Sequence, residues 1–217
     1  MDEITRIRGE IAHEVFDYQA LVGALSDYSK PRDKITKLLA SGSVIRIKKG
    51  LYCFGKALRK GPASREYVAN LIYGPSYISL EYALGYHGLI PERVEVVTSV
   101  TTRRSRRFNT PLGVFTYRSL REPRYATGAM LESVGETSFL IATPEKALAD
   151  KVWTDKRFKG ARMVDFRSYL LDDLRIDEKD LSLLSTDRLE TVKRAYRSAK
   201  IDRLVCYVGR LRGTLNA

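Results

Sequence analysis

The sequence is poor in the residues that most often carry out catalysis or hold metals. Only two of its 217 residues are histidine, His13 and His87. The motifs HExxH, GxSxG and GxGxxG are absent, and so is the phosphate-binding P-loop. The adjacent Asp172 and Asp173 would point to different sides of a helix, which is poor geometry for a shared metal. We therefore expect a protein that is not an enzyme and that needs neither a metal nor an organic cofactor.

Cysteine and long apolar runs are also scarce. The two cysteines, Cys53 and Cys206, lie far apart between apolar residues and form no CxxC pair. This predicts two buried free thiols and a reducing compartment. No apolar run approaches the roughly 20 residues that cross a bilayer, and the first residues, MDEITRIRGEIAHEVF, lack the apolar core of a signal peptide. The expected location is the cytoplasm.

Positive charge is plentiful by comparison. Lysine and arginine number 38 against 26 acidic residues, which gives a formal net charge of +12. Such a balance favours a polyanionic partner, because each neutralised phosphate releases bound counterions. The alternative is a basic protein without that specialisation. A hydrophobic content of 44% is enough for one large core or two small ones.

Residues 18–54, YQALVGALSDYSKPRDKITKLLASGSVIRIKKGLYCF, contain an apolar helix, a polar turn, a second, basic helix and a basic hairpin. Ile4, Ile7 and Ile11 fall at helical spacing ahead of them, and Asp17 is a suitable N-cap for the next helix. This order of parts is that of a winged helix-turn-helix. It predicts a DNA-binding domain over residues 1–60, with Ile47 in its small core.

The basic helix has clear start and stop signals. Pro31 is tolerated in its first turn, and Gly42 can adopt the left-handed cap that ends it. Ile35, Leu38 and Leu39 form its core face, so the basic side faces outward. We expect it to read base edges in the major groove. The residues expected to contact DNA from this helix, its preceding turn and the hairpin are Tyr28, Ser29, Lys30, Arg32, Lys34, Lys37, Arg46, Lys48 and Lys49. A solvated basic helix on an unrelated domain and a protein-binding winged helix are the alternatives.

A linker at residues 55–65 leads to a second domain, placed at residues 61–217. Strands are expected at 94–101, 113–120 and 138–143, with helices between them and a helical region over the last sixty residues. The predicted fold class is therefore α+β, a winged helix-turn-helix followed by a mixed α/β domain with a helical C-terminal region.

The segment between the first two of those strands is strongly basic. Arg103, Arg104, Arg106 and Arg107 occupy four of five positions in what is read as a loop. Such crowding is unfavourable unless an anion neutralises it, and arginine suits bidentate phosphate contact. These four residues are therefore added to the expected DNA-binding set. A flexible, solvated hairpin tip is the alternative.

Two further groups of charges have less specific interpretations. A basic run between residues 188 and 212 is either a solvated helix face or a contact for DNA or a toxin. Glu145 and Asp150, close in sequence to Lys146 and Lys151, are read as surface ion pairs. His87 is read as a packed or hydrogen-bonded core histidine.

Three segments together resemble a known family. They are GPSYISLEYALGYHGLIPE at 74–92, VEVVTSVTTRR at 94–104 and FLIATPEKALADKVW at 139–153, and VIRIKKGLYCF at 44–54 is similar to the wing of the same family. The family is that of the AbiEi antitoxins of type IV toxin–antitoxin, abortive-infection systems. The likeness covers most of residues 15–155.

The resemblance implies a winged helix followed by an antitoxin domain. It implies repression of the protein's own operon through inverted repeats in the promoter. It also implies a neighbouring nucleotidyltransferase-type toxin that is countered without a stable complex. The rival hypotheses are a stand-alone regulator with a ligand-sensing C-terminal domain, and an enzyme acting on nucleotides. A toxin gene immediately downstream would favour the antitoxin.

Overall fold

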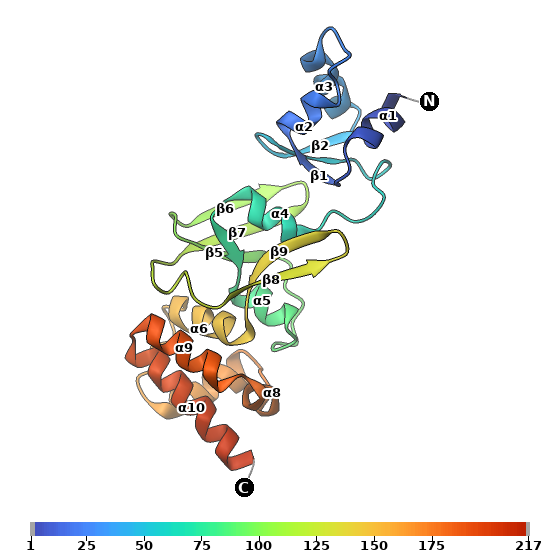
Figure 1. Cartoon of the computed structure of the whole chain (residues 1–217). Coiled ribbons are helices and arrows are strands. Elements are labelled where there is room, and N and C mark those ends of the chain that lie inside the picture. Colours follow the sequence, from blue (N-terminus) through green and yellow to red (C-terminus); the bar gives the residue numbers. More distant parts are fainter. Residues whose placement is uncertain (1–2, 216–217) are drawn as a thin grey trace.

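The structure is a computed structural model that describes residues 3–215 and, for side chains, residues 5–214. The side chain of Ile4, expected on the first apolar face, lies outside the described residues. The molecule is elongated, with a small N-terminal unit at one end, a six-stranded sheet in the middle and a group of helices at the other end (Figure 1). Helices and sheets are mixed in this way along the chain, so the α+β class is confirmed.

The N-terminal unit contains short helices and one three-stranded antiparallel sheet, in strand order β1-β3-β2. Its elements are α1 (Glu3–Glu10), β1 (Val15–Asp17), α2 (Tyr18–Gly23), α3 (Pro31–Ala40), β2 (Val44–Lys48) and β3 (Leu51–Phe54). The local signals behave as predicted. The Asp17 side chain caps α2 by accepting from the Ala20 amide, Pro31 opens α3, and Gly42 follows it with a φ of +71°.

Both faces of the three-stranded sheet are buried. Phe16 and Tyr52 point into a cluster with α1, α2 and α3, whereas Leu51 and Cys53 point to the opposite face. That second face belongs to the large core of the rest of the chain. The placement of Ile47 in the small N-terminal core is therefore wrong, because side chains alternate along a strand and Ile47 faces the second unit.

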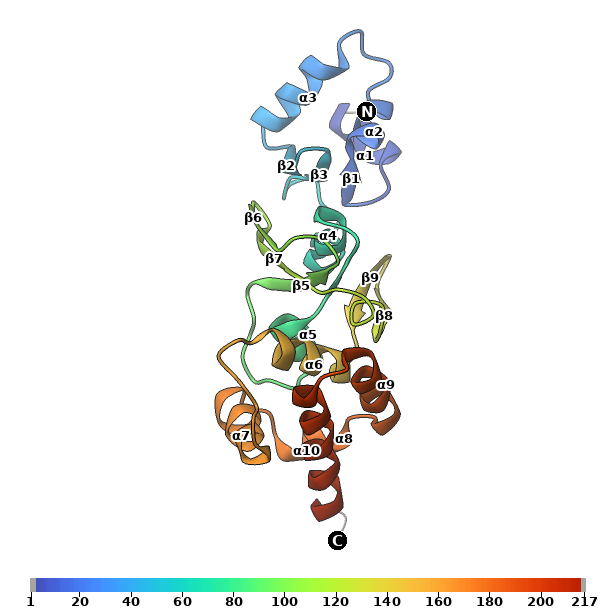
Figure 2. The same cartoon turned by 90° about the vertical axis from the view of Figure 1, so that its left-hand side faces the viewer.

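The central sheet is mixed, in strand order β6-β7-β5-β4-β9-β8. Its strands are β4 (Ser76–Ile78), β5 (Val97–Thr101), β6 (Arg106–Thr110), β7 (Gly113–Ser119), β8 (Ala129–Val134) and β9 (Thr137–Ala142). Helix α4 (Arg65–Ile72) covers the face nearer the N-terminal unit, and the Tyr117 hydroxyl donates to the Ala69 carbonyl of that helix at 2.6 Å. Helices α5 (Leu80–Tyr86) and α6 (Pro144–Thr154) cover the other face (Figure 2).

Three of these strands differ from expectation. The sequence predicts β5, β7 and β9, but β4, β6 and β8 are additional, and the supposed basic loop of residues 102–112 contains β6. Strand β4 is only three residues long, too short for a periodic signal. Strands β6 and β8 lie at the two edges of the sheet, where charged and polar side chains are tolerated.

The C-terminal region is helical, as predicted. It contains α7 (Met163–Arg167), the π-helix η1 (Ser168–Asp173), α8 (Glu178–Leu183), α9 (Thr186–Tyr196) and α10 (Ala199–Leu215). Cys53 is a buried free thiol, as predicted. The prediction for Cys206 is wrong, because Cys206 is exposed on α10, away from the buried helix face that carries Leu204 and Val208. None of the helices in the described part of the chain combines the length and apolar content of a membrane span.

Helix α6 is enclosed rather than exposed, which overturns its reading as a helix with surface ion pairs. Glu145, Lys146, Asp150 and Lys151 are all buried, and Lys146 and Asp150 are fully so. The reason is tertiary. The sheet and α5 pack on one side of α6, and α9 and α10 pack on the other. An i,i+4 charge pair looks the same in sequence whether or not another helix covers it.

Candidate nucleic-acid interface

A group of cations meets where the hairpin of the N-terminal unit touches the second unit. The Lys48 ammonium donates to the Ile72 carbonyl at the C-terminal end of α4. Burial and the nearby Arg103 guanidinium lower the pKa of Lys48. Lys48, predicted to contact DNA, is thus half-buried at the joint between the two units. The tip itself carries Lys49, which is exposed.

Tyr73, the residue after α4, organises the arginines of the β5–β6 segment. The guanidinium carbons of Arg103 and Arg106 lie 5.7 and 5.6 Å from the centre of its ring. Its hydroxyl donates to the Arg104 carbonyl at 3.2 Å. The partial negative charge at the C-terminal end of α4 also favours cations here. We name Lys48, Tyr73, Arg103 and Arg106 the junction cluster.

The four arginines of this segment do not form one patch. In the antiparallel pairing of β6 with β7, Arg106 is opposite Tyr117 and Arg107 is opposite Thr116. Paired side chains share a face, and neighbours along a strand point to opposite faces. Arg106 thus lies on the face of α4 and the hairpin, and Arg107 lies on the face of α5 and α6. All four arginine side chains are exposed.

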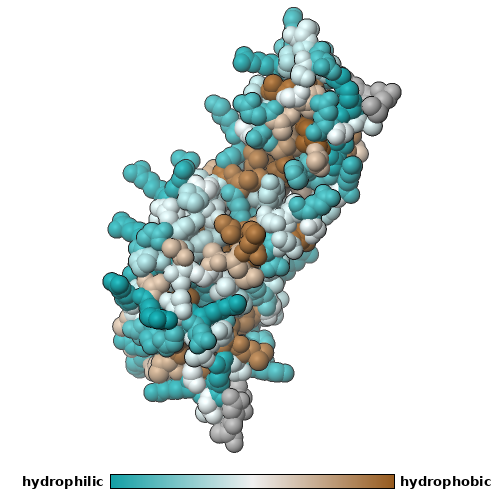
Figure 3. All heavy atoms as spheres, in the orientation of Figure 1, coloured by the Kyte–Doolittle hydropathy of each residue, from teal (hydrophilic) through white to brown (hydrophobic). Residues whose placement is uncertain are grey.

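The residues expected to contact DNA from the N-terminal unit are mostly exposed. Ser29, Lys30, Arg32, Lys37 and Arg46 are exposed. The structure brings α3, the β2–β3 hairpin and β6 to the same side of the long molecule, at the left in Figure 2. Figure 3 shows an adjoining part of the surface, where hydrophilic side chains project along the left edge that faces the viewer in Figure 2. The segments that carry most of the predicted residues therefore lie on one side of the molecule.

Tyr28 and Lys34 are exceptions, since both are half-buried. The Lys34 ammonium lies 5.6 Å from the centre of the Tyr28 ring, and the Arg6 guanidinium lies 5.3 Å from the same ring centre. Arg6 also forms an ion pair with Asp27. These contacts fix the turn that precedes α3. Tyr28 therefore has a structural role in this turn, which the sequence alone did not indicate.

A second polar site, deep in the molecule, was missed by sequence reasoning. The Lys146 ammonium donates to Asp150 and to the Tyr196 hydroxyl, the latter at 2.8 Å, and Tyr196 itself donates to Asp150. Ser79, the residue before α5, also donates from its hydroxyl to Asp150 at 2.7 Å. Burial lowers the pKa of Lys146 despite the Asp150 charge. All four side chains are closed to solvent, so this network holds helices together and offers no access to a substrate.

His87 behaves as predicted, with its Nε2 2.8 Å from the Ala142 carbonyl. Tyr73 is the one residue of the junction cluster that was not selected from the sequence. It follows the end of an amphipathic helix, and only the tertiary fold brings the arginines to its ring.

No protein-family model matches the chain, and no curated protein matches it in sequence.

Proposed function

We propose that the chain is a double-stranded DNA-binding regulator whose N-terminal unit is a winged helix-turn-helix and whose second unit adds phosphate contacts. The observation that carries the proposal is that α3, the β2–β3 hairpin and β6, which all carry exposed cations, lie on one side of the molecule. It is a binding role and not a catalytic one.

The connectivity of the N-terminal unit supports the winged-helix assignment. A helix, a strand, two helices and a hairpin follow in order, and the first strand completes the hairpin's sheet. In such modules the second helix of the pair enters the major groove and the hairpin flanks it. Here that helix is α3, whose Lys30, Arg32 and Lys37 side chains are exposed. These residues are proposed to contact the DNA bases and phosphates.

The junction cluster supports a polyanion as the partner. Arg103 and Arg106 share one aromatic ring, and burial together with the charge of Arg103 lowers the pKa of Lys48. No salt bridge to either arginine is found among the described residues. Like charges held this close repel one another, and a phosphate backbone would relieve that repulsion.

The antitoxin part of the proposal rests on the resemblance of residues 74–92 and 139–153 to the AbiEi family. On this proposal the protein represses its own promoter at inverted repeats and counters a nucleotidyltransferase-type toxin without a stable complex. The alternative is a stand-alone regulator whose second unit senses a ligand. It is favoured by an open cavity on the α5–α6 face of the central sheet.

DNA binding is tested by footprinting the region upstream of the gene and measuring affinity at several salt concentrations. We expect a protected inverted repeat and a steep salt response, with a slope of about −0.9 in log K against log salt for each phosphate contact. Arg32→Ala and Lys37→Ala should weaken operator binding more than random-sequence binding. Lys49→Ala should lower both together. Lys179→Ala, exposed on α8 at the far end of the molecule, is the matched control.

A flat salt response, or equal effects of Lys37→Ala and Lys179→Ala, would overturn the DNA proposal. The antitoxin role has a separate test, in which the chain is co-expressed with the product of the neighbouring gene and growth is measured. Rescue of growth supports that role. A DNA-binding protein that gives no rescue would support the stand-alone regulator.

A further inference from the structure

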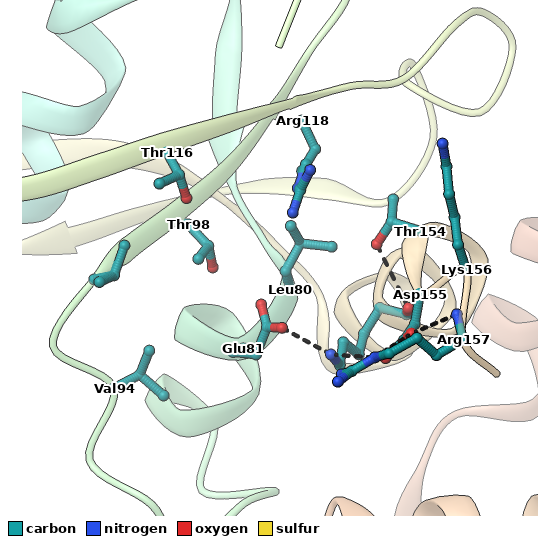
Figure 4. A pocket seen from close by; sticks show the side chains of 12 residues that line it. Leu80, Glu81, Val94, Thr98, Thr116, Arg118, Thr154, Asp155, Lys156 and Arg157 are labelled. Carbon is teal, nitrogen blue, oxygen red and sulfur yellow. Dashed lines mark hydrogen bonds and ion pairs between the residues drawn. The ribbon is translucent and has the colours of Figure 1, made fainter. Parts of the chain in front are cut away.

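A concave site on the face of the central sheet opposite α4 has the lining of an anion-binding pocket. Its volume is about 560 Å³, which falls within the range of small-molecule sites. Strands β5 and β7 form one wall, and α5, the end of α6 and the residues that follow form the other (Figure 4). None of the residues proposed above to contact DNA is part of its lining.

The sheet wall supplies hydroxyl groups and one guanidinium. Thr98 and Thr116 are direct partners in the parallel pairing of β5 with β7, so they lie side by side on one face. Arg118 is two residues further along β7 on that same face, and it extends from the strand towards Leu80 (Figure 4). The Thr98 hydroxyl donates to the Ser79 carbonyl, which anchors this wall to the start of α5.

The helical wall supplies the remaining charges, and some of them cancel. Lys151 lies 2.8 Å from Glu81 and 3.3 Å from Asp155, and Arg157 lies 3.5 Å from Asp155. Burial acts to raise the pKa of Asp155, but hydrogen bonds from Arg157 and the charge of Lys151 outweigh it and lower that pKa to about 2. Both carboxylates are thus already committed to cations of this wall.

Arg118 and Lys156 remain as the cations of the lining without a carboxylate partner among the described residues. The lining as a whole carries four cations and two carboxylates, which leaves a net charge of +2. That charge matches a phosphate dianion. Arginine and threonine are donors that suit phosphate oxygens.

The rest of the lining indicates the body of the ligand. Leu80, Val94 and Val96 provide a small aliphatic surface, and no aromatic side chain is present on which a nucleobase could stack. The cavity is larger than a bare phosphate needs. Leu80 itself has a φ of +60°, an unfavourable value for a residue with a β-carbon, and such outliers cluster at functional sites.

We infer that this cavity binds a small organic phosphate of the sugar-phosphate class, with Arg118, Lys156 and Thr116 holding the phosphate. The inference goes beyond the proposed DNA binding and does not rest on it. A site here would give the second unit a ligand of its own, on the sheet face opposite the one that α4 and the junction cluster occupy.

The test is calorimetric titration of the full chain with ribose 5-phosphate, with inorganic phosphate and with ribose. We expect saturable binding of ribose 5-phosphate, weaker binding of inorganic phosphate and none of ribose. The double variant Arg118→Met and Lys156→Met should lose at least about tenfold in affinity for ribose 5-phosphate. Arg106→Met, on the opposite face of the same sheet, is the matched control and should bind it normally.

The same variants separate this inference from DNA binding. Arg106→Met should weaken promoter binding and spare the sugar phosphate, and the Arg118 and Lys156 variant should do the reverse. Absence of saturable binding of either phosphate probe to the folded protein would overturn the inference. So would binding that the double variant leaves unchanged. A double variant that loses promoter affinity as Arg106→Met does would assign this face to DNA instead.

Discussion

At the scale of single residues, the largest change in interpretation concerns Lys146 and Asp150. Their i,i+4 spacing is that of a solvated helix pair, worth a few tenths of a kcal/mol. In the structure both are fully buried, and Asp150 also accepts hydrogen bonds from Ser79 and Tyr196. The network joins α6 to α9 and to the residue that precedes α5. A buried pair of this kind fixes geometry, and its cost appears when one partner is removed.

We therefore predict that Lys146→Met destabilises the protein strongly, by about 3–5 kcal/mol, because Asp150 is left as an uncompensated buried charge. The double variant Lys146→Met with Asp150→Leu should recover most of that loss, since no charge then remains. Urea unfolding followed by circular dichroism measures both. If Lys146→Met unfolded at the same urea concentration as the parent protein, the ammonium could not be buried as described.

At the scale of elements, strand β6 determines how the four clustered arginines are used. As a loop they would share one flexible patch, but two of them, Arg106 and Arg107, lie in the strand and point to opposite faces of the sheet. Arg106 joins Arg103 at the Tyr73 ring, on the side of the hairpin. Arg107 lies opposite Thr116 and donates to Asn109 at 3.3 Å.

This alternation predicts unequal effects of two neighbouring substitutions on DNA binding. Arg106→Ala should lower promoter affinity and reduce the salt slope by about 0.9, the value of one lost phosphate contact. Arg107→Ala should change neither, although it removes the same charge one position away. Fluorescence anisotropy with labelled promoter DNA at several salt concentrations distinguishes them. Equal losses would show that net charge, and not the face of β6, governs binding.

The sequence predicts elements well where local chemistry determines them. Asp17, Pro31 and Gly42 are correctly assigned as helix boundaries, because caps and breakers act within a few residues. The edge strands β6 and β8 lack such signals, and their pairing is decided by residues far away in the chain. The burial of α6 and the role of Tyr73 also arise only from tertiary contacts, so no local pattern could reveal them.

At the scale of the whole molecule, the joint between the two units decides which surfaces face the same way. The three-stranded sheet presents Val15, Ile47, Leu51 and Cys53 to the large core, and each of these side chains is at most 6% exposed. The bond from Lys48 to Ile72 lies at the same joint. An apolar contact of this kind holds α3 and the junction cluster in one orientation. It also means that the N-terminal unit, cut away alone, exposes an apolar sheet face.

That exposure leads to a prediction in which the same substitutions have opposite consequences in two contexts. In the isolated fragment of residues 1–60, Ile47→Thr with Leu51→Thr should reduce self-association and dye binding, because it makes an exposed apolar face polar. In the full chain the same pair should cost roughly 2–5 kcal/mol, since both side chains are buried there and the hydroxyls gain no partner. Light scattering on the fragment and urea unfolding of the full chain provide the two measurements.

A matched pair on the other face, Tyr52→Thr with Phe54→Thr, should destabilise both forms, because those residues belong to the unit's own core. If the first pair left the full chain as stable as the parent, the two units would not be joined through this sheet, and the common orientation of α3 and the arginines would lose its physical basis.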